Sequence, residues 1–420
     1  SLPSKLSGAS HTCVIFSNTD LKCVGLNANG QLGYSDTTTR GDSSASIGDN
    51  LAAVDLGTGL YATAVAAGTS HTCVILQTAA VKCWGLNSAA QLGLGDTTNR
   101  GSSSSTSVSS LPAVDLGTGV TATAVSAGDS HTCVITNSAA LRCWGYNNRG
   151  QTGYGSTSSP YLYIGDSSSE MGSGLTSVSL GTGRTATKVW CGSSFTCVLL
   201  DDATTKCFGE GTRYQLGTGS ATTISTSSQM GDSLAAISLD FTAAAAGAAG
   251  QYFACVLSSA GVLKCFGVNT SGQLGQDSTS SSGTATGSGL AATYLGGSVT
   301  ATSVCAGANH ACAILSTGGM KCWGLASKGQ LGYGDTNTRG AASGTYSMAS
   351  LAALSIPAGL TVTAIASSHA ATHTCAIFSD GTLRCWGNNS SGQLCQGSTS
   401  TYGDGAGETL DVLAAADFGS

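Results

Sequence analysis

The chain has 420 residues, a net charge of −6 and a charged-residue content of only 9%. Its 16 lysines and arginines are spread thinly, which excludes the concentrated basic surface that tracks nucleic-acid phosphates. The apolar content of 41% indicates a packed protein, and no apolar run is long enough to cross a membrane.

A sequence segment with two cysteines ten positions apart occurs seven times along the chain. At residues 71–96 it reads HTCVILQTAAVKCWGLNSAAQLGLGD. The first cysteine of each copy follows the previous one after 57 to 64 residues. Such a period indicates a repeat architecture, so we expect one domain over residues 1–420. The repeats span approximately residues 1–60, 61–120, 121–184, 185–240, 241–298, 299–360 and 361–420.

Each copy predicts four short strands and almost no helix. In the third copy, TATAV at residues 121–125 is alternating and β-branched, and HTCVIT follows at 131–136. A short polar turn then leads to LRCWG at 141–145, so the second and third strands form a hairpin. A segment such as LPAVDLGTG at 111–119, which precedes the next copy, supplies the fourth strand. Four short antiparallel strands repeated in this way predict an all-β fold, a seven-bladed β-propeller.

The two ends of the chain complement each other. The last residues, LAAADFGS, match LAAVDLGTG at 51–59, and KLSGASHTC near the start matches AVAAGTSHTC at 64–73. We therefore expect strands from both termini to complete one blade and close the ring, which removes exposed sheet edges. The beginning SLPSKLSGAS contains neither an initiator methionine nor a signal peptide, as expected for a processed product or a fragment.

The characteristic residues of the repeat occur in a fixed order, which two copies show most completely. They read AGTSHTCVILQTAAVKCWGLNSAAQLG at residues 67–93 and AGANHACAILSTGGMKCWGLASKGQLG at 306–332. These copies resemble the repeats of the regulator-of-chromosome-condensation family, and the resemblance implies a seven-bladed propeller. The paired cysteines and long Ser/Thr-rich loops resemble the secreted members of that family. Some copies depart from the pattern, because phenylalanine replaces the repeat histidine at Phe195 and Phe253, and the last copy has QLC instead of QLG.

The two cysteines of each copy lie symmetrically about the hairpin turn. Facing residues on paired strands have Cα atoms about 4.5–5.5 Å apart, which a disulfide can span. We predict seven disulfides, with metal binding and reduced packing cysteines as alternatives. The pairs are Cys13–Cys23, Cys73–Cys83, Cys133–Cys143, Cys197–Cys207, Cys255–Cys265, Cys312–Cys322 and Cys375–Cys385. Disulfides at this density imply an oxidising compartment, so we expect a secreted, extracellular protein.

Three further cysteines fall outside this pattern: Cys191, Cys305 and Cys395. We expect them to be small buried apolar residues, with an additional bridge or a covalent link to another subunit as alternatives. Candidate N-glycosylation sequons occur at Asn269, Asn388 and Asn389, and the uncharged Ser/Thr-rich loops would suit O-glycosylation.

Other repeat landmarks favour structural roles. Five histidines share one position, but two copies have phenylalanine there, so we expect hydrogen bonds to neighbouring backbone rather than a metal site. They are His11, His71, His131, His310 and His373. We expect the repeat tryptophans in the core and Trp190, outside the pattern, at a surface contact. The loop sequences DTTTRG, DTTNRG and DTNTRG each predict an Asp–Arg pair, with a calcium site as the alternative.

The sequence shows no nucleophile–base pair, recurrent carboxylate dyad or metal-ligand constellation, so we expect neither enzymatic activity nor a cofactor. His369, in SSHAATH, is the one residue of a catalytic type that lies in a local departure from the repeat pattern. We favour a non-enzymatic extracellular structural or adhesive scaffold, a glycosylated subunit of a filament or surface coat.

The alternative function is a secreted protein-binding or inhibitor propeller that acts through its loop face. Tyrosines that follow the hairpins would supply its contacts: Tyr34, Tyr154, Tyr161, Tyr163 and Tyr333. The expected partners are other subunits in a self-assembly or an unknown extracellular protein, with glycans as a further class. We expect neither nucleic-acid binding nor membrane insertion.

Overall fold

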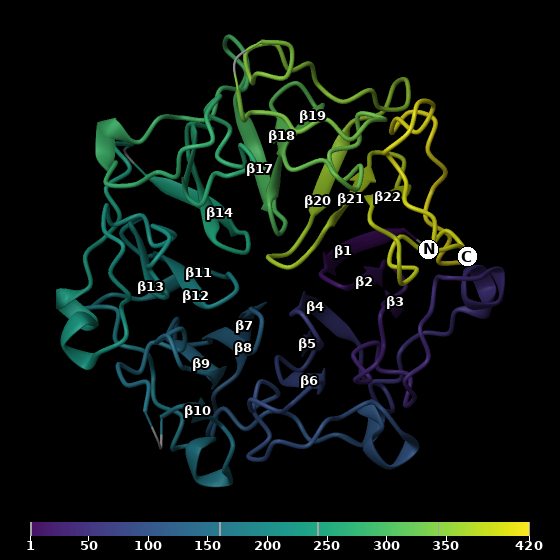
Figure 1. The fold of residues 1–420 in the computed structure, drawn as a ribbon. Helices are drawn as coiled ribbons and strands as arrows, with labels where there is room; N and C mark the ends of the chain where they lie inside the picture. Colours follow the sequence, from purple (N-terminus) through teal and green to yellow (C-terminus); the bar gives the residue numbers. More distant parts are fainter. Residues whose placement is uncertain (1, 159–160, 242, 343, 420) are drawn as a thin grey trace.

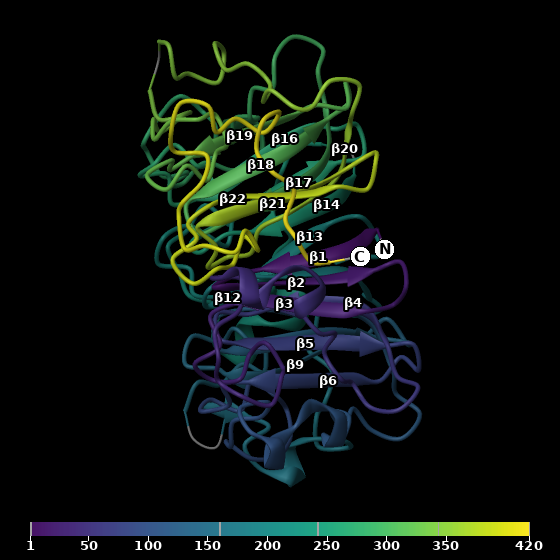
Figure 2. The ribbon, with the colours of Figure 1, turned by 90° about the vertical axis from the view of Figure 1, so that its right-hand side faces the viewer.

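Seven small β-sheets surround a central axis in the computed structural model, which describes residues 2–158, 161–241, 243–342 and 344–419. Figure 1 looks along this axis and shows the sheets as the blades of a ring, and Figure 2 shows the ring from its edge. The predicted all-β, seven-bladed propeller is confirmed. No helix in the described part of the chain has the length and apolar character needed to span a bilayer.

Every blade has an inner, a middle and an outer strand, connected as an antiparallel meander. The inner strands are β1 (Pro3–Gly8), β4 (Ala62–Ala67), β7 (Ala122–Ala127), β11 (Ala186–Cys191), β14 (Ala244–Ala249), β17 (Ala301–Ala306) and β20 (Val362–Ala366). The middle strands are β2 (His11–Phe16), β5 (His71–Leu76), β8 (His131–Thr136), β12 (Phe195–Leu200), β15 (Phe253–Ser258), β18 (His310–Leu315) and β21 (His373–Phe378). The outer strands are β3 (Leu21–Gly25), β6 (Val81–Gly85), β9 (Leu141–Tyr146), β13 (Thr205–Gly209), β16 (Leu263–Gly267), β19 (Met320–Gly324) and β22 (Leu383–Gly387).

Short 3₁₀ helices lie in the long loops at the periphery (Figure 1). They are η1 (Ser44–Ser46), η2 (Gly48–Asn50), η3 (Ser104–Thr106), η4 (Val108–Ser110), η5 (Ser168–Glu170), η6 (Ser227–Gln229), η7 (Gly231–Ser233) and η8 (Gly287–Gly289).

The predicted fourth strand is reduced to separate contacts in most blades. In the second blade, for example, Val114 N donates to Val81 O at 2.8 Å. In the first blade the hydroxyl of Tyr34 accepts from Cys23 N and donates to Cys23 O, at 3.0 and 3.1 Å. A side chain thus satisfies two backbone groups that a fourth strand would otherwise pair. Among the described residues, the third blade alone has a regular fourth strand, β10 (Tyr163–Ile164).

The two termini meet at the junction between the first and seventh blades, as Figures 1 and 2 show. Lys22 Nζ on β3 donates to Phe418 O at 2.7 Å, and Ala416 N donates to Leu383 O on β22 at 2.8 Å. The ends therefore join as predicted, but they do not share one sheet. β1 pairs with β2 in the first blade, whereas the C-terminal segment lies outside β22 in the seventh.

Both faces of each sheet are covered by neighbouring blades, so the middle strands do not alternate between apolar and polar residues. All six residues of β5 are buried, including the polar side chains of His71 and Thr72. Water does not reach such side chains, so their polar atoms need partners in an adjacent blade.

The repeat histidines meet this requirement by bonding to threonines of the next blade. His71 Nε2 lies 2.9 Å from Thr132 Oγ1, and Thr132 donates its hydroxyl proton to Gln91 O at 2.9 Å. Since the threonine proton is used in that bond, the histidine Nε2–H is the donor of the first one. Equivalent contacts join His11 to Thr72, His131 to Thr196, His310 to Thr374 and His373 to Thr12. The acceptor is therefore a side chain of the next blade rather than the backbone expected from the sequence.

The two copies without the histidine show that histidine and threonine act as one unit. Where Phe195 replaces the histidine, the next blade has Ala254 instead of threonine. Where Phe253 replaces it, the next blade has Ala311. Each phenylalanine is buried in one apolar cluster with its alanine. Loss of one partner would leave a buried polar group unpaired at about 1–3 kcal/mol, whereas replacement of both partners by apolar groups is nearly neutral.

We predict that this apolar pair can be transplanted to another blade boundary. The Thr132→Ala variant leaves the buried His71 Nε2–H without its acceptor and should lower the free energy of unfolding by about 1–3 kcal/mol. Gln91 O keeps a second donor, Trp144 Nε1 at 2.9 Å. Adding His71→Phe, which reproduces the Phe195–Ala254 pair, should recover most of the loss. Guanidinium unfolding of the disulfide-intact variants measures the coupling, and purely additive effects would contradict the paired arrangement.

The same histidines should make the fold sensitive to mild acid. Burial lowers the pKa of four of them from 6.5 to about 3 and that of His373 to about 4. Below pH 6.5 the unfolded chain takes up protons at these positions before the folded chain does. Their contribution to stability is therefore complete above that pH and is lost as the pH falls toward 3.

Between pH 7 and pH 5, each of these histidines should reduce the free energy of unfolding by about 2 kcal/mol. Most carboxylates titrate below this window, so the histidines dominate the change. Guanidinium midpoints at the two pH values measure it. The variant His71→Phe/Thr132→Ala has one such histidine fewer and should lose correspondingly less stability. A loss as large as that of the wild type would show that His71 does not remain neutral in the fold.

Candidate binding face and cysteine sites

The structure brings the paired cysteines together within every hairpin. Cys73 on β5 lies directly opposite Cys83 on β6, with a Cα–Cα distance of 4.1 Å. All seven pairs named from the sequence are bonded in this way, and their side chains are buried. Each bond spans a sequence separation of 10 residues. By constraining the unfolded chain, such a bond contributes roughly 2–3 kcal/mol.

The three remaining cysteines are buried thiols. Cys191 and Cys305 lie on the inner strands β11 and β17, and the Cys395 thiol donates to Asp417 O at 3.0 Å. Burial raises the pKa of Cys191 and of Cys305 to about 12. The structure therefore agrees with small buried residues at these positions. It does not agree with a covalent link to another subunit, because a second chain cannot reach sulfurs inside the blades.

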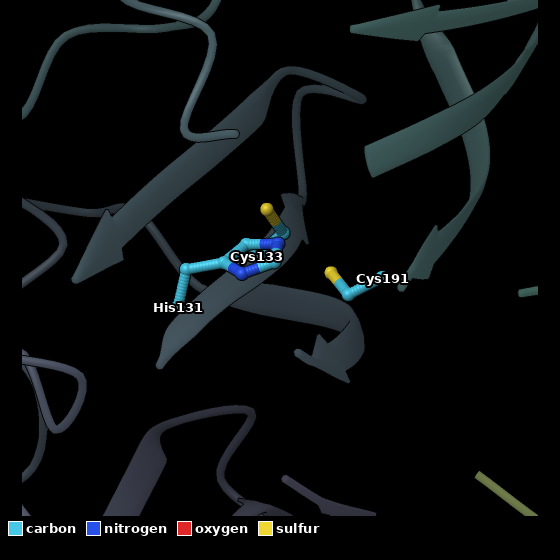
Figure 3. A group of neighbouring side chains, drawn as sticks. All are labelled: His131, Cys133 and Cys191. Carbon is cyan, nitrogen blue, oxygen red and sulfur yellow. The ribbon is translucent and has the colours of Figure 1, made fainter. Parts of the chain in front are cut away.

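Cys191 also belongs to a group of potential metal ligands. One donor atom each from His131, Cys133 and Cys191 lies within 4.8 Å of the other two, and all three residues are buried (Figure 3). Cys133 is bonded to Cys143, however, and His131 Nε2 is engaged with Thr196 Oγ1 at 3.0 Å. A disulfide sulfur carries no thiolate charge, so the group in this state is not a metal-binding set.

Two of the three candidate glycosylation asparagines are internal. Asn269 and Asn389 are fully buried, and their side chains donate to Ser278 O and Ser398 O, both at 2.8 Å. A glycan would have to replace these hydrogen bonds and leave through a packed loop, so the folded chain does not accommodate one at either position. Asn388 is partly exposed and remains a candidate.

The turns between inner and middle strands and the adjacent GQLG loops form one face of the ring, which we call the Asp129 face. At its centre Asp129 accepts hydrogen bonds from Thr69 Oγ1 at 2.7 Å, from His369 Nε2 at 2.8 Å and from Ser193 Oγ. These residues come from the second, seventh and fourth blades, and Asp129 comes from the third. One carboxylate therefore links four blades at the mouth of the central channel.

The Asp129 network explains why His369 stands outside the repeat pattern. Burial disfavours the ionised carboxyl, but the hydrogen bonds and the charge of His369 outweigh it and hold the pKa of Asp129 well below its usual range. Ser193 and His369 each bond to the carboxylate, which lies between them. A catalytic triad instead needs the histidine between the serine and the acid, so this arrangement does not activate Ser193 as a nucleophile.

Below this network the inner strands line a cavity of about 260 Å³. Trp190 of β11 forms part of its wall. A Cβ atom on Gly247 of β14 would lie 3.0 Å from the Trp190 indole, so the absence of a side chain makes room for the ring. The other inner strands carry leucine, valine or isoleucine at the position of Gly247. Trp190 therefore packs in the channel wall, which corrects the surface contact expected from the sequence.

Three of the five tyrosines predicted to form a binding rim direct their hydroxyls into the blades. Burial raises the pKa of Tyr34, Tyr154 and Tyr333 above its usual value. Tyr154 Oη donates to Thr176 O at 2.8 Å, and Tyr333 Oη donates to Ala352 O at 3.1 Å. These tyrosines hold the outer loops against the sheets, so their hydroxyls are not available to a partner.

The other two tyrosines belong to a partly exposed aromatic patch on the third blade. The Tyr163 ring stacks on Tyr146 with centroids 5.3 Å apart, and Tyr161 is 49% exposed. Arg149, on the next loop, is exposed and has no ion-pair partner among the described residues. We call these four residues the blade-3 patch. It lies on the Asp129 face, because Tyr146 N donates to Ser130 O in the adjacent turn at 2.8 Å.

An arginine–aromatic pair lies on the same face in the fourth and fifth blades. The Arg213 guanidinium is 4.0 Å from the centroid of the Tyr252 ring. Sequence reasoning missed Tyr146, Tyr252 and both arginines. The available signal was substitution within the repeat, since Tyr252 occupies a position that is serine, threonine or asparagine in the other copies.

Models of one known family match several of the repeats. A model of the Regulator of chromosome condensation (RCC1) repeat matches residues 62–91, 122–151, 301–330 and 362–393, and a second model of that repeat matches residues 81–135. The human and mouse (Homo sapiens and Mus musculus) proteins named Probable E3 ubiquitin-protein ligase HERC4 are 29% identical to the chain over 216 residues. These matches cover 51% of this chain and 18% of each relative, so the chain spans less than a fifth of their length.

Solved structures share the fold at low sequence identity. Two crystal structures of Prp20 from yeast (Saccharomyces cerevisiae), one bound to Kap60, have a TM-score of 0.68 at 15% and 16% identity. They cover 95% of this chain and 84% and 86% of the yeast chains. Human WBSCR16 has a TM-score of 0.65 at 17% identity, covering 87% of this chain and 84% of the human chain. At these identities the likeness shows the fold alone.

The cysteine arrangement predicts the number of reactive thiols. Iodoacetamide should label three cysteines in the denatured, unreduced protein and all 17 after reduction. The three would be Cys191, Cys305 and Cys395. Intact-mass spectrometry before and after reduction counts the added groups and also shows any attached glycan. More than three labels without reduction would mean that at least one hairpin lacks its bond.

Proposed function

We propose that this β-propeller, in which models of the regulator of chromosome condensation repeat match several copies, is a non-enzymatic protein-binding propeller that engages its partner through the Asp129 face. The observation that carries this proposal is the blade-3 patch. There the stacked rings of Tyr146 and Tyr163, the exposed Tyr161 and the exposed Arg149 gather at the end of β9, where Asn147 Nδ2 donates to Tyr161 O at 3.0 Å. Tyrosine and arginine are enriched among the residues that dominate binding energy in protein interfaces.

Most lysines and arginines of the described chain bind groups within the fold, and the Asp129 face carries exposed ones. Seven basic residues of the outer strands direct their charged ends to backbone carbonyls: Lys22, Lys82, Arg142, Lys206, Lys264, Lys321 and Arg384. Three arginines form the predicted pairs with aspartates of their own loops: Arg40, Arg100 and Arg339. Ten of the 16 cations therefore serve the fold. Arg149, Arg213 and Lys328 are exposed on the Asp129 face, where an acidic partner surface would complement them.

The structural relatives support a protein as the partner. The printed descriptions of yeast Prp20 name Kap60 in a complex and binding properties toward Gsp1p and histones. These partners are properties of Prp20, whose identity to this chain is 15–16%. The shared fold favours protein binding as a class of function, and the identity of the partner depends on the residues of this chain.

Catalysis by the propeller itself is not supported. The name of the HERC4 relatives describes a ubiquitin ligase, but the match covers only 18% of their length. The cluster of Ser193, Asp129 and His369 places the carboxylate between the serine and the histidine. Both observations favour a binding role.

A second proposal concerns where the protein works and how it assembles. Seven bonded cysteine pairs favour an oxidising compartment, so we propose that the propeller is secreted. An extracellular scaffold of self-assembled propellers is the alternative function. It is favoured by exposed Val262 and Tyr294 on the opposite face, which the hairpin turns form, because head-to-tail assembly needs contacts on two different surfaces.

Photo-crosslinking distinguishes binding through the Asp129 face from assembly. Benzoylphenylalanine in place of Tyr161 should capture the partner in medium from the producing cells. The same group in place of Tyr294, which is also 49% exposed but lies on the hairpin face, should not. The purified partner should bind the Tyr161→Ala/Arg149→Ala variant about tenfold more weakly than the wild type, as expected for two lost interface contacts.

Unchanged affinity of that variant would contradict binding through the blade-3 patch. If both positions capture only further copies of the chain, and negative-stain images show filaments, the scaffold function replaces the binding function.

A further inference from the structure

A free thiol of the fourth blade lies against the disulfide of the third. The sulfur atoms of Cys191 and Cys133 belong to the group whose donor atoms lie within 4.8 Å of one another, with the His131 ring beside them (Figure 3). Thr196 Oγ1 lies 3.8 Å from Cys133 Sγ and 4.0 Å from Cys191 Sγ. The thiol is on the inner strand β11 and the disulfide joins β8 to β9, so the contact crosses a blade boundary.

We propose that Cys191 exchanges with the Cys133–Cys143 disulfide. The Cys191 thiolate attacks Cys133 Sγ, the Cys133–Cys191 bond forms, and the Cys133–Cys143 bond breaks. Cys143 leaves as a thiolate and takes up the proton that Cys191 lost. One disulfide and one thiol exist before and after the step, so it needs no external oxidant or reductant. The third blade loses its hairpin bond, and the third and fourth blades become covalently linked.

Cys191 faces the disulfide of the neighbouring blade, and Cys305 is the buried thiol to compare with it. The other inner strands have glycine, alanine or serine at the equivalent position. Cys305 lies one position earlier in its own strand, directly opposite Cys312 of its own blade. Neighbouring residues of a strand point to opposite faces of the sheet, so Cys305 and Cys191 face in different directions. Cys305 is therefore the matched control, a buried thiol of the channel wall in a different setting.

The surroundings make the exchange slow at neutral pH. Burial raises the pKa of the Cys191 thiol to about 12, so its thiolate is scarce at pH 7. The nearby titratable groups are His131, whose pKa burial lowers to about 3, and Asp129 and His369 at the channel mouth. Above pH 7 His131 therefore stays neutral and does not titrate with the thiol. The thiolate fraction then rises tenfold per pH unit, so exchange should be about 100-fold faster at pH 9 than at pH 7.

Peptide mapping tests this proposal on the intact chain. The protein is held at pH 7 and at pH 9 without reductant, with circular dichroism to show that it stays folded, and is then acid-quenched, unfolded, alkylated and digested with trypsin. Cleavage after Arg142 and Arg149 isolates residues 143–149, CWGYNNR, whose only cysteine is Cys143. Exchange releases this peptide in alkylated form. It also links residues 101–142, which contain Cys133, to residues 189–206, which contain Cys191.

We expect alkylated 143–149 to appear about 100-fold faster at pH 9 than at pH 7, at a rate independent of protein concentration. Cys191→Ser should abolish its appearance, and Cys305→Ser should leave its rate unchanged. The proposal is overturned if residues 143–149 stay linked to residues 101–142 at pH 9 in the wild type. Release from the Cys191→Ser variant at the wild-type rate would overturn it equally.

Discussion

Burial of both faces of every sheet is the constraint on which this propeller depends. A blade cannot cover its own middle strand, so each polar group on that strand needs a partner in the next blade. Two successive hydrogen bonds, from His71 to Thr132 and from Thr132 to Gln91 O, supply such partners across one boundary. At the boundary between Phe195 and Ala254 both polar members are absent, and the same geometry is kept by apolar packing. The ring is thus specified pair by pair, and a single member of a pair cannot change alone without cost.

Features confined to one repeat were predictable from the sequence. The spacing of Cys73 and Cys83 sets the hairpin register, because residues equidistant from a turn lie opposite each other. Features shared between blades were not predictable in this way. Asp129 and His369 are 240 positions apart, and nothing in either local sequence indicates that they meet. The His–Thr pairing was partly accessible, since Phe195 is accompanied by Ala254 in the sequence itself.

A short sequence pattern does not reveal where a side chain points. The sequence predicts Tyr34 at a binding rim, but its hydroxyl occupies the place of a fourth strand beside Cys23. The sequons at Asn269 and Asn389 coincide with the repeat asparagine, whose carboxamide organises the GQLG loop from inside. In both cases a polar group satisfies backbone atoms that a short strand leaves unpaired.

Several departures from the repeat gather in one sector of the ring. The Phe195 substitution, the complementary pair Trp190 and Gly247, the thiol of Cys191 and the blade-3 patch all belong to the third, fourth and fifth blades. Ring closure alone gives no physical reason for variation to be concentrated, because every blade boundary has the same packing to satisfy. Within this sector the packing is kept by joint substitution, while the chemistry at the channel wall and on the Asp129 face changes. We therefore expect the functional surface in the third to fifth blades, where the packing between blades is kept and the exposed side chains differ from the repeat.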